Sequence, residues 1–192
     1  MQKVDSFYPN CFYHIYNRGN NRENIFIETA NYRYFLDLVT KYICPIAEIF
    51  AYCLLKNHFH FLVRLKTFEV LKTSKVYSQA FSNLFNSYAK AINKRYNRTG
   101  SLFQTRFGRK QVKSDGYLVY LIHYIHFNPQ KHGLVKDFRH YAHSSYRSIL
   151  SVWPTRVERE QVIELFGDRT GFRNFHEEND DFSVIQNLVE EN

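Results

Sequence analysis

The sequence lacks several features that would place it in other protein classes. No run of about 18 apolar residues occurs, so we expect no transmembrane helix. The N-terminus has no apolar signal-peptide core, and the three cysteines, Cys11, Cys44 and Cys53, form no Cys-x-x-Cys pair. These absences argue against a secreted disulfide scaffold and a cysteine-based zinc site, and they predict a cytoplasmic protein. Repeats and low-complexity segments are absent as well, and 192 residues suffice for one domain with or without an appendage.

Positive charge and aromatic side chains are abundant. Lysine and arginine total 26 against 18 acidic residues, and 18% of the chain is aromatic. This composition favours a nucleic-acid binder, although a basic protein with a phenylalanine-rich core has the same composition. The charge is uneven, because residues 56–147 carry a net +14, residues 1–55 are neutral and residues 148–192 carry −6. We therefore place the polyanion-binding surface in the middle of the chain.

Hydrophobic patterns predict an α+β fold in which helices pack on an antiparallel sheet. Aromatic and β-branched runs predict strands at 11–18, 46–55 and 58–65, with a basic strand or extended loop at 101–113. Apolar residues at helical spacing predict helices at 30–43, 74–97 and 115–127. The second and third strands are too close in sequence for a parallel crossover, so they should pair antiparallel. Pro129 disfavours helical geometry at Asn128, so we expect the third helix to end there.

The charge balance changes near Trp153-Pro154, where we expect a seam. Residues 1–150 form the predicted domain, and residues 151–192 form an acidic C-terminal helical extension with a short helix at 155–166. Three roles fit an acidic extension of this kind: it covers the basic surface, stabilises a dimer or packs on the domain.

The segment Asn57-His58-Phe59-His60-Phe61 has the most informative pattern. Side chains alternate between the faces of a strand, so His58 and His60 should share one face while Phe59 and Phe61 point the other way. Two imidazoles about 7 Å apart on one face can hold a divalent cation if a third ligand comes from elsewhere. The alternative is a pair of surface or stacking histidines.

The helix predicted at 115–127 offers a third ligand and a nucleophile. Tyr124 and Asn128 are four residues apart and therefore share a helix face. If that face covers the histidine pair, Asn128 supplies a carbonyl oxygen and the Tyr124 hydroxyl lies beside the metal. A tyrosine, a metal and a basic groove are the components of a phosphodiester-cleaving site. Alternatively, Tyr124 is an aromatic core residue, and from its helix alone it is no better a candidate than Tyr117 or Tyr120.

Several blocks of the sequence, in the right order, resemble one family. His58-Phe59-His60 resembles the HUH motif (His-hydrophobic-His) of the single-tyrosine, insertion-sequence-type transposases. Further segments resemble the REP-associated tyrosine transposase group within that family, namely residues 14–20, 51–63, 98–104, 124–129 and 144–146. The likeness covers roughly residues 8–150.

The resemblance implies the HUH endonuclease fold, a ferredoxin-like or RRM-like antiparallel sheet with helices on one side. It also implies that His58, His60 and Asn128 bind Mg²⁺ or Mn²⁺ and that Tyr124 is the nucleophile. The implied activity is metal-dependent cleavage and rejoining of single-stranded DNA through a 5′-phosphotyrosine and a free 3′-hydroxyl, without ATP. The implied partner is single-stranded DNA with a hairpin, bound by a monomer or a homodimer.

Two positions depart from the family pattern. Lys56 stands where a proline commonly precedes the Asn-His turn, which adds a charge but leaves the ligands intact. His126 replaces the usual acidic residue after the tyrosine, and its position two residues from Tyr124 should point it away from the metal. We expect the nearby His123 and His132 to contact DNA or lie on the surface rather than to bind metal.

Charge and family position together predict the DNA contacts. After the first strand, the candidates are Asn17, Arg18 and Asn20, although these residues also suit a turn held by asparagine side chains. The predicted phosphate track is Arg106, Arg109, Lys110 and Lys113, extended by Lys90, Lys94 and Arg95. A solvated basic face is the alternative. Two other functions stay open: a non-catalytic RRM-like nucleic-acid binder, and a metal-dependent nuclease that forms no covalent adduct.

Overall fold

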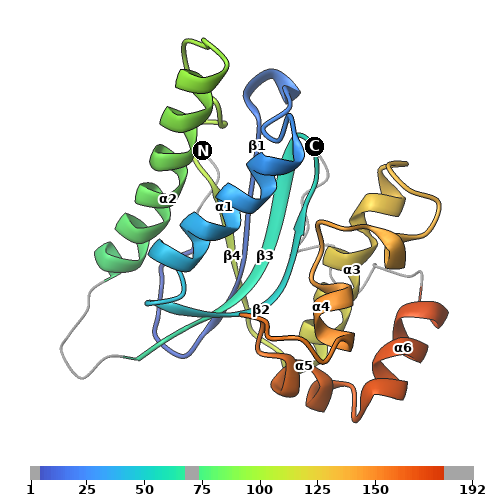
Figure 1. Ribbon diagram of the computed structural model, residues 1–192. Coiled ribbons are helices and arrows are strands. Elements are labelled where there is room, and N and C mark those ends of the chain that lie inside the picture. Colours follow the sequence, from blue (N-terminus) through green and yellow to red (C-terminus); the bar gives the residue numbers. More distant parts are fainter. Residues whose placement is uncertain (1–4, 68–73, 180–192) are drawn as a thin grey trace.

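A four-stranded antiparallel sheet lies at the centre of the computed structural model, which describes residues 5–67 and 74–179 (Figure 1). Its strands are β1 (Phe12–Arg18), β2 (Ala47–Leu54), β3 (His58–Leu65) and β4 (Gly108–Val112), in the order β2-β3-β1-β4. The predicted α+β class and the antiparallel pairing of β2 with β3 are confirmed. Of the extended segment expected at 101–113, only the second half forms β4.

The pairing register determines which side chains share a face of the sheet. Opposite residues of an antiparallel pair point to the same side. Arg18 of β1 pairs with His58, Tyr16 pairs with His60, and His14 pairs with Lys110 of β4. We call this side of the sheet the histidine face; it carries His14, Tyr16, Arg18, His58, His60 and Lys110.

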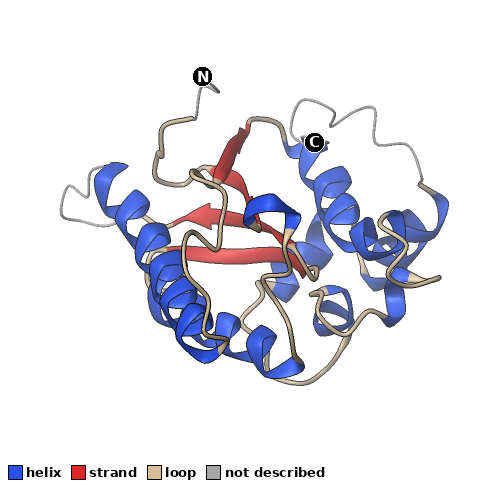
Figure 2. Ribbon diagram, turned by 90° about the horizontal axis from the view of Figure 1, so that it is seen from above, coloured by secondary structure: helices blue, strands red, loops and turns tan. Residues whose placement is uncertain are grey.

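Two helices, α1 (Thr29–Tyr42) and α2 (Ser74–Arg95), cover the opposite face (Figures 1 and 2). Phe59 points into this layer, where its ring centroid lies 5.2 Å from Phe35 of α1 and 5.4 Å from Phe85 of α2. The predicted alternation of histidine and phenylalanine side chains along β3 is therefore confirmed. Burial of these aromatic rings provides the main apolar core and fixes the orientation of the histidine face.

The helix α3 (Asp115–Lys131) packs on the histidine side, so helices flank both sides of the sheet (Figure 1). The expectation of helices on one side only is wrong. The predicted end of this helix near Asn128 is also wrong, because Pro129 lies inside its last turns. The turn persists because the Asn128 amide donates to the carbonyl of Tyr124 at 2.8 Å and the His132 N–H donates to the carbonyl of Asn128 at 3.0 Å.

Shorter elements complete the structure. They are two 3-10 helices, η1 (Asn20–Arg22) and η2 (Phe138–His140), and the helices α4 (Tyr146–Leu150), α5 (Arg159–Leu165) and α6 (Arg169–Glu178). Val157 forms a bridge with Ile49 of β2, so the segment after residue 150 contacts the sheet directly. The domain boundary at residue 150 stays a prediction. No helix in the described part of the chain combines the length and apolar character needed to cross a membrane.

Candidate active site

His58 and His60 are adjacent on the histidine face, with ring centroids 5.3 Å apart and ring planes at 90°. Nδ1 of His58 donates to Oδ1 of Asn57 at 2.7 Å, and Nδ1 of His60 lies 2.9 Å from Nε2 of His14. Metal-binding imidazoles are usually oriented by such a contact through the second ring nitrogen. The Asn57 contact leaves Nε2 of His58 as the acceptor nitrogen of a neutral ring.

Two buried polar atoms at this place have no hydrogen-bond partner among the described residues: Nε2 of His58 and Oδ1 of Asn128. An unpaired buried acceptor is costly and calls for an explanation such as a bound ion. Residues 5–67 and 74–179 contain no group of three or more His, Cys, Asp or Glu side chains that could hold a metal. The available ligand set is therefore two imidazoles and an amide oxygen, and its unpaired acceptors fit a divalent cation.

Burial lowers the pKa of both imidazoles. The pKa of His58 falls to about 3, first through desolvation and then through the positive charges of His132 and Arg18, while the Asn128 side chain acts in the opposite direction. Desolvation also lowers the pKa of His60 well below its usual value, and His14 contributes next. Both rings are thus neutral near pH 7, which is the form that binds a metal.

The helix α3 brings Tyr124 to the histidine pair within the same chain. The Tyr124 ring centroid lies 5.7 Å from that of His60 and 6.4 Å from that of His14. With an exposed fraction of 3%, Tyr124 is enclosed between the helix and the sheet. Tyr117 on the same helix is exposed, and Tyr120 packs against Phe175 of α6. The structure therefore places Tyr124, and not its two neighbours, beside the histidines.

Three further residues at the site were not assigned to it from the sequence. His14 contacts His60 through the hydrogen bond above, Lys131 places Nζ 5.2 Å from the Tyr124 ring centroid, and the exposed His132 lies 4.7 Å from His58. His14 could have been identified from its alternation with Tyr16 and Arg18 on one strand. Lys131 was missed because the helix was expected to end near Asn128, whereas His132 is exposed, in agreement with the expected surface position.

A groove of about 690 Å³ lies between α2 and the segment 100–107. Its lining includes Asn17, Asn86, Phe103, Gln104, Arg106 and Phe107, and the described residues that line it include no carboxylate. Asn17 lines the groove, whereas the next residue of β1, Arg18, lies opposite His58 on the other face. The end of β1 therefore connects this groove with the candidate metal site.

The structure divides the predicted phosphate track between the two faces of the sheet. Arg109 pairs with Ile15, away from the histidines, and its guanidinium donates to the carbonyl of Asp5 at 2.6 Å and to Oγ of Ser78 at 3.1 Å. Lys110 lies on the histidine face, while Arg106 and Lys113 are exposed. The four residues therefore do not form one continuous track.

The other predicted DNA contacts lie farther from Tyr124 along the chain and are mostly exposed. Asn20 is exposed in η1, and Lys90 and Lys94 are exposed on α2. Arg95 forms an ion pair with Glu28 at 2.7 Å. A surface ion pair of this kind leaves Arg95 less available to a phosphate than the two lysines.

His123 and His126 lie on the side of α3 that faces the C-terminal helices. His126 is buried, with Nδ1 2.9 Å from Nε2 of His176, so it points away from His58 and His60, as predicted. His123 is also fully buried, with its ring 5.0 Å from that of His176. The expectation that His123 contacts DNA or lies on the surface is wrong, because α6 covers this side of α3.

Comparison with known proteins links this arrangement to one family. The family model described as "Transposase IS200 like" matches residues 7–128, a span that includes both histidines, Tyr124 and Asn128. A solved structure of a REP-associated tyrosine transposase bound to a REP hairpin has the same fold, with a TM-score of 0.64 at 18% identity. That match covers 80% of this chain and 88% of the other. No curated protein sequence matches significantly.

Proposed function

Because the chain belongs to the IS200-like transposase family, we propose that it cleaves and rejoins single-stranded DNA with Tyr124 as the nucleophile. The main support for this proposal is that the ring centroids of Tyr124 and His60 lie 5.7 Å apart in the same chain. Asn128 follows one turn later on α3, and its unpaired Oδ1 accompanies the unpaired Nε2 of His58. A single chain therefore contains the proposed nucleophile and the three proposed ligands.

We assign His58, His60 and Asn128 as ligands of Mg²⁺ or Mn²⁺. These residues would hold the cation, whose chemistry there would be to polarise a non-bridging phosphate oxygen. His14 and Asn57 hold the two imidazoles in place through Nδ1. Arg18 and Lys110 add positive charge on the same face, which attracts the phosphate.

In the proposed reaction, Tyr124 attacks the phosphorus in line. Its hydroxyl loses a proton, a bond forms between Oη and phosphorus, and the bond to the 3′ oxygen breaks. The leaving oxygen takes up a proton and becomes a 3′-hydroxyl. One phosphodiester replaces another, so an incoming 3′-hydroxyl reverses the step without ATP. Lys131 places a positive charge beside the nucleophile, with Nζ 5.2 Å from the Tyr124 ring centroid.

The groove beside α2 supplies a path for the DNA strand. The half-buried Phe107 offers a ring on which an unpaired base can stack, and the exposed Arg106 offers a cation for phosphate. The DNA strand then passes the end of β1. There Asn17 contacts it in the groove and Arg18 contacts it on the histidine face. By analogy with the relative bound to a REP hairpin, we propose that the bound DNA is a hairpin with a single-stranded flank and that the protein acts in the DNA-containing cytoplasm.

Replacement of Tyr124 tests this function. The probe is a pool of DNA hairpins with a randomised single-stranded flank, labelled at the 3′ end and incubated with protein and Mn²⁺ before a denaturing gel. Wild type should give a labelled covalent protein band; Tyr124→Phe should bind the pool without forming it. Tyr117→Phe, a change on the exposed side of the same helix, should retain the band.

Other results distinguish the remaining functions. Adducts in Tyr124→Phe would show that the nucleophile is another residue. A shortened, 3′-labelled free strand without any adduct would indicate a hydrolytic nuclease. Binding without cleavage in every metal tested would indicate a non-catalytic binder.

A further inference from the structure

A chain of hydrogen bonds runs along the buried side of α3 that faces away from the sheet. Oγ of Ser145 lies 2.8 Å from Nε2 of His126, and Nδ1 of His126 lies 2.9 Å from Nε2 of His176. Nδ1 of His176 lies 2.8 Å from the carbonyl oxygen of Phe172. All three side chains have exposed fractions of 2% or less.

One arrangement of protons satisfies all three of these contacts with neutral rings, if the Ser145 hydroxyl donates to His126 rather than to the more distant Tyr52 carbonyl at 3.3 Å. The carbonyl of Phe172 only accepts, so Nδ1 of His176 donates to it and Nε2 of His176 accepts from His126. His126 then carries its proton on Nδ1, and its Nε2 accepts from the hydroxyl of Ser145. Each imidazole is therefore held by two partners, which fixes its tautomer and its orientation.

One end of the chain is attached to the strand next to His60. The N–H of Tyr52 in β2 donates to Oγ of Ser145 at 2.9 Å, and the N–H of Ser145 donates to the carbonyl of Tyr52 at 2.9 Å. The following residue of β2, Cys53, pairs with His60 in β3. Ser145 is thus bonded to the sheet one residue away from the position that faces His60.

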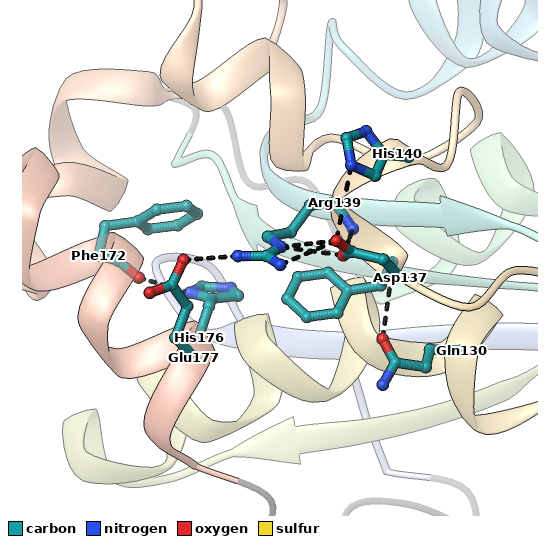
Figure 3. Close-up of polar contacts among 8 residues, drawn as sticks. Gln130, Asp137, Arg139, His140, Phe172, His176 and Glu177 are labelled. Carbon is teal, nitrogen blue, oxygen red and sulfur yellow. Dashed lines mark hydrogen bonds and ion pairs between the residues drawn. The ribbon is translucent and has the colours of Figure 1, made fainter.

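The other end of the chain holds α6 against α3. His126 follows Tyr124 by two residues, which places it roughly 200° around the helix on the opposite side of the same turn. The rings of Phe172 and His176 lie 4.2 Å apart, and Arg139 of η2 pairs with Glu177 of α6 at 2.6 Å (Figure 3). The turn of α3 that carries Tyr124 is therefore packed between the sheet on one side and α6 on the other.

We propose that Ser145, His126 and His176 are positioning residues that set the place of Tyr124 relative to His60. This inference rests on the proposed role of Tyr124 as the nucleophile. His60 pairs with Cys53, and the neighbouring Tyr52 is hydrogen-bonded to Ser145. Ser145 in turn contacts His126, which lies in the same turn of α3 as Tyr124. The Tyr124 ring packs beside His60, so these contacts link the two residues through both the sheet and the helix. A misplacement of about 1 Å in a reacting group can cost about 100-fold in rate, so the register of α3 on the sheet matters for attack. His176 lies beyond residue 128, so the C-terminal extension contributes to the geometry of the site.

Two replacements of His176 separate hydrogen bonding from packing. His176→Leu keeps an apolar side chain of similar bulk but cannot accept from His126. His176→Gln restores an acceptor for His126 and a donor for the Phe172 carbonyl. We expect the single-turnover rate of adduct formation at saturating hairpin pool to fall about 10- to 100-fold in His176→Leu and to recover largely in His176→Gln. Affinities for the hairpin pool and for Mn²⁺ should stay unchanged in both variants.

Asn174→Leu is the matched control, because the same substitution falls on the exposed side of α6. Its rate should equal that of wild type. A wild-type rate in His176→Leu, with thermal melting showing a folded protein, would overturn the proposal. So would a His176→Gln variant as slow as His176→Leu, since packing rather than hydrogen bonding would then explain the loss.

Ser145→Ala tests the other end of the chain with a smaller change, and it decides the question if His176→Leu does not fold. We expect the adduct rate to fall about tenfold with unchanged Mn²⁺ affinity; a wild-type rate would overturn the proposal. The proposed function fails differently, because Tyr124→Phe would then still form adducts. If the function holds and only this inference fails, adducts depend on Tyr124 but their rate does not respond to Ser145 or His176.

Discussion

The two sides of α3 carry two groups of buried histidines that differ in the hydrogen-bond partners of their ring nitrogens. Toward the sheet, Nε2 of His58 lacks a hydrogen-bond partner in the described structure, as does Oδ1 of Asn128. Away from the sheet, His126 and His176 are bonded at both ring nitrogens. Burial lowers the pKa in both groups. Burial and a low pKa therefore do not distinguish a ligand site from a structural network, and the hydrogen-bond partners of the rings are what separate His58 from His126 and His176.

The surroundings of the two groups also differ in charge. On the histidine face, Arg18 lies opposite His58 and Lys110 lies opposite His14, so two positive charges accompany the histidines there. On the other side, aromatic rings of Phe138, Tyr146 and Phe172 enclose the histidines. The first group suits a polyanionic ligand and the second suits a fixed packing role. The predictions below test this contrast.

The largest effect should follow loss of a metal ligand. His58→Ala should weaken Mn²⁺ binding by more than about 100-fold in calorimetry, which exceeds the effect typical of a residue that only orients a ligand. His126→Gln, on the other side of α3, should leave Mn²⁺ affinity unchanged. An unaltered affinity in His58→Ala would remove this residue from the ligand set.

His14→Ala should have the next largest effect, because the His60 ring loses the partner of its Nδ1. We expect Mn²⁺ affinity to fall about 10- to 100-fold. His14→Gln, which offers an acceptor to His60, should recover part of the loss. If the Ala and Gln variants bind Mn²⁺ as wild type does, His14 does not orient the ligand.

The buried network should make the folded state sensitive to acid. The folded pKa of His176 is about 3, mainly through desolvation, below the usual value of 6.5. Its contribution is therefore complete above pH 6.5 and declines as the pH falls toward 3, by about 1.4 kcal/mol per pH unit. Urea unfolding at pH 7 and pH 5 should show that His176→Gln loses about 2 kcal/mol less than wild type over this interval. Equal losses would contradict the low pKa of this residue.

The smallest effects should come from Arg106 and Arg95, two of the four arginines assigned to DNA binding. Arg106→Ala removes a cation from the groove, so the slope of log affinity against log salt should fall by about 0.7 for a single strand. Arg95→Ala removes a side chain already paired with Glu28, and its salt slope should change less. Titration of the hairpin pool at several salt concentrations compares them. A larger change of the salt slope in Arg95→Ala than in Arg106→Ala would show that the DNA contacts Arg95 rather than the groove that contains Arg106.

Local pattern was sufficient for much of the fold. The strand predicted at 58–65 coincides with β3, because alternating histidine and phenylalanine residues report a strand with two different faces. The helix end at Asn128 was mispredicted, because a single proline lowers helix propensity locally while hydrogen bonds around it preserve the turn. Tertiary contacts prevailed over the local preference there.

The candidate site was predictable where its residues lie close in sequence. Strand spacing places His58 with His60, and helix spacing places Tyr124 with Asn128, whereas the choice of Tyr124 over Tyr117 and Tyr120 came from the family resemblance. The role of His14 depends on the register of β1 against β3, and the burial of His123 depends on docking of α6, so neither follows from a local pattern. That Tyr124 faces His60 in the same chain depends on which side of the sheet α3 covers.

The most direct test of the central claim is to map the covalent adduct by mass spectrometry. Wild-type protein is incubated with the hairpin pool and Mn²⁺, digested with protease and nuclease, and searched for a tyrosine that carries a nucleotide 5′-phosphate. We expect this modification on Tyr124, and we expect it to disappear when the divalent metal is chelated. Modification of Tyr16, Tyr117 or Tyr120 instead, or adduct formation without a divalent metal, would contradict it.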